Sequence, residues 1–394
     1  MKKHLKIYLP ILFLVFAVSF TFAQSEQGEI IITPEFSHFG MKPIPVSLDG
    51  FSGEVLDVLK FDLYVQGFSF VAPDAAQYQI SGSNSGNVTG HVTDKLARKE
   101  ILSISYTGAA LRREAHAFAD DIIFTITGKK GIGQTKIAFK AAAASYGSGE
   151  IYVSDFDGHN ALSVTHDGAI VAAPAWVPGR LALYYTSYQP GNPDIFFHDL
   201  STGRRSVIAK FSGVNTSAAV SPDGSKVAMI LDKAGVVNVY VCNADGTGLK
   251  RLTTSEEDSS PCWSPDGQWI CFATKINERR VLAKVPAAGG EIQVIHTVGA
   301  PSPTEPDWSP DNKWIAFTCQ FSGEFDICIA PAGGGAPVIL TAGEDPSWSP
   351  NSRTLVCTRR AGGHYALSVL DVFTKQVKDI GRISGNDSQP AWAK

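Results

Sequence analysis

Cysteine and charge are scarce in this chain of 394 residues, and each scarcity excludes a class of protein. Only 6 cysteines occur, and the first of them is Cys242, so a lipid-modified N-terminal cysteine is excluded. Their spacings match no zinc signature. Charged residues make up 18% of the chain and the formal net charge is −4, which argues against nucleic acids and anionic membrane surfaces as partners. No Gly-x-Ser-x-Gly motif is present, which argues against an α/β hydrolase domain.

The N-terminal segment has the pattern of a secretory signal. Three lysines, the last of them Lys6, precede an apolar stretch that runs to Ala23. We expect cleavage before Gln24, which gives a signal peptide at 1–23 and an exported chain with no transmembrane segment. An uncleaved membrane anchor is the alternative, although the stretch is short for a membrane span.

One phrase, Pro-x-Trp-Ser-Pro-Asp-Gly with variations, returns along the second part of the chain. Its Trp position recurs every 40 to 45 residues, from Trp176 to Trp392, and Val220 stands in place of the second Trp. Each period holds four short β-branched or aromatic runs that are bounded by turn residues. A period of this length with four strands is typical of a propeller blade.

The repeat also predicts how the ring closes. Residues 136–165 supply three strands of a blade that has no Trp segment, and the Pro390-Ala-Trp392 segment has nothing after it. We expect these fragments to form one blade, so that residues 132–394 make a six-bladed all-β propeller without open sheet edges. The Pro-Asp-Gly residues are interpreted as turn formers and not as metal ligands.

Residues 24–131 are predicted to form a separate, smaller α+β (α/β) domain. Its expected helices cover residues 53–65 and 109–125, and the second of them ends at Gly128. Expected strands cover 29–33, 68–71, 87–93 and 100–106. The Gly131-Ile-Gly133 segment lacks the third glycine of a nucleotide-binding loop and is interpreted as a linker.

Two pairs of cysteines are close in sequence. Cys262 and Cys271 flank one turn, and Cys319 and Cys328 bracket a loop in the next repeat. Export would permit disulfides between them, and buried free thiols are the alternative. The sequence does not decide between the two.

Three stretches carry a resemblance to a known family. They are the tail that follows the signal at 24–32, the junction at 112–122 and 127–139 (RREAHAFADDI and TGKKGIGQTKIAF), and the repeats at 151–392. In these stretches the chain resembles the TolB family, the periplasmic propeller proteins of the Tol–Pal cell-envelope system. The resemblance implies a non-enzymatic adaptor, without a cofactor and monomeric, that supports outer-membrane integrity and constriction at cell division.

The resemblance also implies two binding surfaces. One propeller face would bind the lipoprotein Pal around the central channel, and the mature N-terminal tail would bind TolA. The tail comprises Gln24, Ser25, Glu26, Gln27, Gly28 and Glu29. For the Pal-binding face we expect loops before each Pro-x-Trp segment, whose carboxylates would ring the channel mouth and steer a basic partner. These residues are Asn215, Thr216, Ser217, Glu257, Asp258, Ser259, Ser260, Thr304, Glu305, Glu344, Asp345, Asp387 and Ser388.

Other functions stay open as alternatives. A calcium ion could bridge some of these oxygens, but no ligand spacing supports it. A lyase-type propeller enzyme would need histidines that converge on a metal, whereas the propeller histidines fall at different depths of their repeats. A carbohydrate could stack on Trp263, Trp308 or Trp348 in the channel, although we expect these rings to pack between blades.

Overall fold

The computed structural model describes residues 39–108, 110–142, 148–233, 235–321, 323–380 and 385–394. These residues belong to one compact unit. The predicted signal peptide, the strand expected at 29–33 and the tail that begins at Gln24 lie outside the described residues. None of the described helices is long and apolar enough to cross a membrane.

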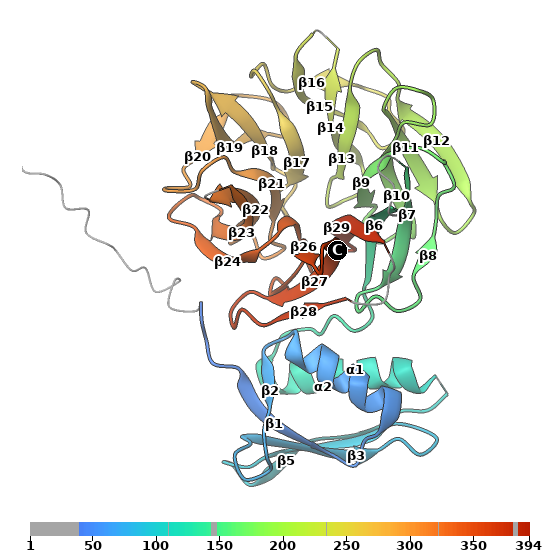
Figure 1. Cartoon of the computed structure of the whole chain (residues 1–394), viewed down its shortest axis with the longest axis vertical. Coiled ribbons are helices and arrows are strands. Elements are labelled where there is room, and N and C mark those ends of the chain that lie inside the picture. Colours follow the sequence, from blue (N-terminus) through green and yellow to red (C-terminus); the bar gives the residue numbers. More distant parts are fainter. Residues whose placement is uncertain (1–38, 109, 143–147, 234, 322, 381–384) are drawn as a thin grey trace, which may run out of the picture. The chain divides into compact units, whose positions relative to one another are not determined.

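The N-terminal part is a five-stranded sheet with two helices (Figure 1). The strand order is β2-β1-β3-β4-β5, in which β1 is Ile44–Asp49, β2 is Phe68–Phe70, β3 is Tyr78–Ser83, β4 is Thr89–Asp94 and β5 is Lys99–Ser105. Strand β1 is parallel to both β2 and β3, whereas β3, β4 and β5 are antiparallel. The connection from β1 to β2 is helix α1, as a parallel crossover requires.

Both helices were predicted from apolar periodicity and both are present. Helix α1 spans Gly53–Tyr64 and helix α2 spans Leu111–Thr127. Their apolar faces share one core with the sheet, in which Leu59 and Phe118 are fully buried. Helix α2 ends as predicted at Gly128, which adopts a left-handed φ of 69°. The sequence analysis missed strands β1 and β3.

Six four-stranded sheets follow, which confirms the predicted six-bladed propeller. The first blade consists of β29 (Asn386–Trp392), β6 (Lys136–Ala142), β7 (Gly149–Asp155) and β8 (Leu162–Ser163). The second consists of β9 (Val171–Trp176), β10 (Ala182–Ser187), β11 (Asp194–Asp199) and β12 (Arg204–Ala209). The third consists of β13 (Asn215–Val220), β14 (Lys226–Asp232), β15 (Val237–Asn243) and β16 (Lys250–Arg251).

The remaining blades repeat the same order. The fourth consists of β17 (Ser259–Trp263), β18 (Trp269–Ile276), β19 (Arg279–Pro286) and β20 (Gln293–Ile295). The fifth consists of β21 (Thr304–Trp308), β22 (Trp314–Phe321), β23 (Glu324–Pro331) and β24 (Val338–Ala342). The sixth consists of β25 (Glu344–Trp348), β26 (Thr354–Ala361), β27 (His364–Asp371) and β28 (Val377–Asp379).

The closure of the ring was also predicted correctly. Strand β29, at the C-terminal end of the chain, pairs antiparallel with β6 and is the innermost strand of the first blade (Figure 1). The register runs from Asn386 opposite Ala142 to Trp392 opposite Ile137. Every blade therefore has its full set of strands, and the first blade joins the two ends of the repeat. The proposed domain boundary at 131 and 132 remains a prediction; α2 ends at Thr127 and β6 begins at Lys136.

The repeated residues hold the blades together in two ways. In the third blade, Asp223 accepts hydrogen bonds from the Ser221 hydroxyl and from the Ser225 N–H, as expected of a turn former. The Trp position instead links neighbouring blades. The Trp263 indole N–H donates to the Ala219 carbonyl, and the Trp348 indole N–H donates to the Asp307 carbonyl.

Candidate functional site

The channel mouth is built from one residue of each blade at the same strand position. Each innermost strand contains a register shift, and the residue at the shift adopts a left-handed conformation. These residues are Ala173, Ser217, Ser260, Glu305, Asp345 and Gln389, with φ angles between 48° and 56°. Together with the residues that follow them, five of which are prolines, they line a cavity of about 210 Å³. The bulge redirects each side chain at this position.

Three of these side chains connect successive blades through hydrogen bonds. Glu305 Oε2 accepts from the backbone N–H of Asp345 at 3.1 Å, and Asp345 Oδ2 accepts from the N–H of Gln389 at 3.1 Å. Gln389 Oε1 accepts in turn from the N–H of Ala173 at 3.0 Å. Two threonine hydroxyls complete the arrangement, Thr318 to Glu305 at 2.7 Å and Thr358 to Asp345 at 3.1 Å. We call Glu305, Asp345 and Gln389 the channel arc.

The charge of the channel arc is smaller than the count of carboxylates suggests. Burial, followed by the neighbouring charges of Glu305 and Glu344, raises the pKa of Asp345 well above its usual value. Burial and the charge of Glu305 also raise the pKa of Glu344. Proton uptake relieves repulsion between carboxyl groups that share one site. Ionisation of Asp345 and Glu344 is therefore less favourable than that of isolated carboxyl groups.

The structure corrects part of the predicted site. The predicted segments are not loops, because all of these residues except Glu257 and Asp258 lie in the innermost strands. Three of the side chains are buried: Asn215 is fully buried, and Asp258 and Asp387 are each 2% exposed. Asp258 accepts from Thr274 of its own blade at 2.6 Å and from Asn238 and the Val239 N–H of the third blade at 3.3 Å, and therefore links the two blades.

Four of the predicted residues line the mouth cavity, and they are Ser217, Ser260, Glu305 and Asp345. Ala173 and Gln389 also line it but were missed by the sequence analysis. Glu257 is exposed and pairs with Arg280 at 3.4 Å. The remaining residues, Thr216, Ser259, Thr304, Glu344 and Ser388, are half-buried beside the ring.

Beyond the prolines, the channel continues as a second cavity of about 400 Å³. Trp176, Trp263, Trp308 and Trp392 contribute to its lining. Trp308 is 5% exposed, and Trp348, in the neighbouring innermost strand, is fully buried. Trp308 and Trp348 are thus packed between blades, as expected from the sequence, whereas Trp263 is half-buried and keeps part of its surface toward the cavity.

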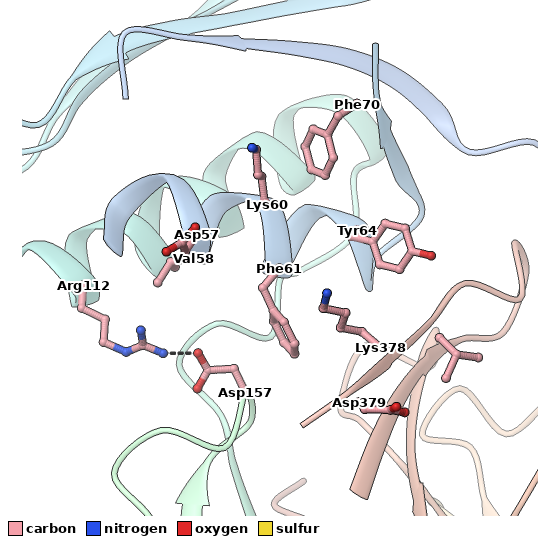
Figure 2. Close-up of a pocket in the computed structure, with 11 residues that line it drawn as sticks. Asp57, Val58, Lys60, Phe61, Tyr64, Phe70, Arg112, Asp157, Lys378 and Asp379 are labelled. Atoms are coloured by element: carbon pink, nitrogen blue, oxygen red, sulfur yellow. Dashed lines mark hydrogen bonds and ion pairs between the residues drawn. The ribbon is translucent and has the colours of Figure 1, made fainter. Parts of the chain in front are cut away.

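A larger cavity of about 790 Å³ lies where the N-terminal part meets the propeller (Figure 2). Helix α1 contributes the aromatic rings Phe61 and Tyr64, and Figure 2 shows Lys378 reaching toward them from β28. At the other end, Arg112 of α2 forms an ion pair with Asp157 of the propeller. Charges of both signs beside aromatic rings could hold a short peptide segment.

Behind this ion pair is a buried polar cluster at the junction. His116 Nδ1 lies 2.7 Å from Asp62 Oδ2, and His116 Nε2 lies 3.8 Å from Asp157 Oδ2. Burial, which outweighs the hydrogen bond from His116, raises the pKa of Asp62 to about 6. Burial lowers the pKa of His116, but the hydrogen bond and charge of Asp62 outweigh it, so the pKa is raised. The pair therefore holds a proton to higher pH than the isolated groups would.

Asp120 completes the polar face of α2. Its Oδ1 accepts from the Gly133 N–H at 2.9 Å, and burial raises its pKa to about 7. A Cβ atom at Gly131 would lie 1.9 Å from Asp120 Oδ1, which explains the glycine there. The Gly131-Ile-Gly133 segment thus packs closely on α2 and does not form a phosphate loop.

The sequence contained a signal for this junction that the analysis did not use. Arg112, His116 and Asp120 are spaced four residues apart and therefore share one face of a helix. That face lies beside the apolar stripe of α2, so polar residues on it were candidates for burial. Among the residues that the structure describes, no group of three His, Cys, Asp or Glu side chains could hold a metal ion.

Comparison with known proteins gives a family match. A family model described as the TolB β-propeller domain matches residues 124–394. A protein named Tol-Pal system protein TolB from Anaeromyxobacter dehalogenans is 27% identical over 296 residues, which is 64% of this chain. A protein of the same name from Anaeromyxobacter sp. gives the same figures. The match spans 65% of the length of each of these curated relatives.

Solved structures show a similar fold. The crystal structure of TolB from Acinetobacter baumannii has a TM-score of 0.82 and 22% identity, and the match covers 90% of this chain and 98% of that one. A TolB structure from Agrobacterium tumefaciens has a TM-score of 0.52 and 18% identity, with 64% of this chain and 91% of that chain covered. At these identities the likeness concerns the fold.

Proposed function

The chain belongs to the TolB β-propeller family, and we propose on this basis that it is a non-enzymatic periplasmic adaptor of the Tol–Pal system. It binds the lipoprotein Pal through the channel mouth and TolA through the mature N-terminal tail at 24–29. In this role it supports the integrity of the outer membrane and its constriction at division. The observation that carries the proposal is the family match over residues 124–394.

The geometry supports the channel mouth as the Pal-binding surface. Six equivalent positions, one from each blade, meet at one cavity on a rigid scaffold. Residues on such a scaffold are positioned before a partner arrives, which reduces the entropy lost on binding. Exposed Glu257 and the ionised fraction of the channel arc would attract a basic patch on the partner.

A substitution at Ser260 tests the Pal surface without breaking the channel arc. Ser260 lines the mouth cavity, and its left-handed φ of 49° strains the backbone to a similar extent with Ser or with Arg at this position. We expect Ser260→Arg to weaken Pal binding at least about tenfold, because a bulky cation would fill the mouth and repel a basic partner. Isothermal titration of the mature chain with soluble Pal measures the effect.

A matched control lies on the outer surface of the ring. Val207 is 45% exposed on the outermost strand β12. We expect Val207→Arg to bind Pal with unchanged affinity, and far-ultraviolet circular dichroism checks that both variants are folded. If Ser260→Arg binds as tightly as Val207→Arg, Pal contacts another surface. The tail is tested separately, because deletion of residues 24–28 should abolish TolA binding and leave Pal binding intact.

A further inference from the structure

All six cysteines are buried free thiols, and two of them face each other across neighbouring strands. Cys262 of β17 is directly opposite Cys271 of β18 in the antiparallel register. The two residues belong to the same apolar cluster, with 8% and 0% of their surfaces exposed. Their side chains are close enough to hydrogen bond to each other.

The local register fixes their separation. The Ser264 N–H donates to the Trp269 carbonyl at 2.9 Å, so these two residues form a hydrogen-bonded pair. Such pairs alternate along an antiparallel ladder, and the Cys262–Cys271 pair, two steps further, is of the same kind. Its Cα atoms are then about 5.5 Å apart, within the range that disulfides span, whereas its Cβ atoms are at the wide end of about 4.5–5.5 Å and must approach to about 4 Å for the bond to form.

A second pair in the same cluster differs in register. Cys319 of β22 is opposite Asp326, and Cys328 of β23 is opposite Phe317, so the two thiols are diagonal neighbours. Diagonal Cα atoms are about 7–8 Å apart, at or beyond the limit that a disulfide spans without backbone movement. The Cys319 and Cys328 thiols are also close enough to hydrogen bond to each other, so the two pairs differ in backbone register and not in the proximity of their thiols.

Access distinguishes the two pairs as well. Cys262 is among the residues that line the second channel cavity, whereas Cys319 is fully buried. Burial raises the pKa of the Cys262 thiol well above its usual value. Only the thiolate reacts with a disulfide, so exchange in the folded blade is slow and is fastest while the blade is still forming.

We propose that Cys262 and Cys271 are a specific oxidation site, at which an intrablade disulfide forms when the chain folds in the presence of a disulfide donor. The thiolate of one cysteine attacks a sulfur of the donor and releases one donor thiol. The other cysteine then attacks the mixed disulfide and releases the second donor thiol. The two cysteines lose two electrons and two protons, and the donor disulfide is reduced to two thiols.

The bond ties the channel wall to the body of the fourth blade. Cys262 is two residues from Ser260 at the channel mouth, and Cys271 is in the adjacent strand β18. The cross-link therefore opposes separation of β17 from β18 beside the bulge at the mouth. It also lowers the conformational entropy of the unfolded chain, which stabilises the folded blade.

Peptide mapping tests the proposal, because trypsin leaves each pair within one peptide. Cleavage after Arg251 and Lys275 releases residues 252–275, which hold Cys262 and Cys271. Cleavage after Lys313 and Arg353 releases residues 314–353, which hold Cys319 and Cys328. The full chain is purified from producing cells without reductant, and a second sample is reduced, unfolded and refolded with oxidised glutathione. Both are alkylated in denaturant before digestion.

We expect peptide 252–275 to carry no alkyl label and to be two hydrogen atoms lighter than its reduced form. Peptide 314–353 should carry two labels. Reductant should lower the urea midpoint of the wild type and of Cys319→Ala, and should not change that of Cys271→Ala. The mapping uses the wild-type chain and does not depend on whether the variants fold.

Two labels on peptide 252–275 in both samples would overturn the proposal, and so would a bond confined to peptide 314–353. Oxidation only in the refolded sample would support the site and would count against export of the chain under oxidising conditions. Because partner binding is not measured, failure of this test is distinguishable from failure of the proposed adaptor function.

Discussion

Replacement of Asp120 by Asn should change how the stability of the N-terminal part depends on pH. Asp120 is a half-buried carboxyl group whose pKa is raised to about 7, mainly by loss of solvation, from a usual value of 3.8. Asn has nearly the same shape, and its Oδ1 can still accept the hydrogen bond from the Gly133 N–H. The substitution therefore removes the ionisation and keeps the local contact.

The sign and size of the effect follow from proton linkage. Between about pH 4 and pH 7 the folded state holds a proton on Asp120 that the unfolded state has lost, so wild-type stability falls as the pH rises. Above pH 7 the free-energy cost of ionising Asp120 in the folded state no longer changes with pH. One pKa unit corresponds to about 1.4 kcal/mol, so the full cost of ionising Asp120 is about 4 kcal/mol. Asp120→Asn avoids this cost and should gain about that much relative to the wild type between pH 4 and pH 8.

The fold supplies two separate probes for the assay. The described helices, α1 and α2, both lie in the N-terminal part, so ellipticity at 222 nm follows its unfolding in urea. All 7 tryptophans occur from Trp176 onward, so their fluorescence follows the propeller alone. Asp62, whose charge contributes to the raised pKa of Asp120, also has a raised pKa and titrates in both proteins.

A constant difference between Asp120→Asn and the wild type from pH 5 to pH 8 would refute this explanation. It would mean that Asp120 is ionised throughout and that burial does not control its pKa. Asp74→Asn is the control, because Asp74 is exposed in a turn and its charge is already solvated. The free energy of unfolding of Asp74→Asn should equal that of the wild type at every pH.

Two further predictions use matched pairs of residues. Trp348→Phe should lower the free energy of unfolding by about 1 kcal/mol more than Trp308→Phe, because the Trp348 indole N–H donates to the Asp307 carbonyl at 3.1 Å whereas the buried Trp308 indole nitrogen has no hydrogen-bond partner. Urea unfolding, followed by the fluorescence of the remaining tryptophans, measures the difference. Equal losses of stability would contradict the role of the bond. Arg112→Met should lower the free energy of unfolding by about 3 kcal/mol, because it leaves the Asp157 carboxylate buried without its cation. Glu54→Gln should lower it by less than about 1 kcal/mol, because Glu54 is exposed. Similar urea midpoints for the two variants would contradict this prediction.

The propeller could be predicted from the sequence because the features that define a blade lie within each repeat. The Trp spacing set the length of a blade, and the incomplete repeats at 136–165 and 390–392 indicated how the ring closes. The Ser-Pro-Asp-Gly segments were correctly interpreted as turns, since Asp and Ser bond to each other within them. These features depend on residues that are close together in the sequence, so a single sequence is enough to recognise them.

The site was harder to predict because it depends on contacts between repeats. Asp258 and Asp345 occupy similar positions just before a Pro-x-Trp segment, yet Asp258 is buried between the third and fourth blades whereas Asp345 faces the channel. They differ by two residues in their distance from the following proline, and a strand bulge lies between the two positions. Strand alternation without that bulge would assign the side chains to the wrong faces.

The channel arc links the binding surface to the contacts between blades. Glu305 and Asp345 line the mouth, and each also satisfies a backbone N–H of the next blade. A partner cation that draws either carboxylate toward itself must compete with that N–H, which also has a threonine hydroxyl as a second acceptor at 3.2 Å, Thr318 for the Asp345 N–H and Thr358 for the Gln389 N–H. Partners that leave these bonds in place and contact Ser217, Ser260 or the prolines avoid this competition. The arrangement therefore favours a basic partner that approaches the acids while it leaves the hydrogen bonds of the channel arc in place.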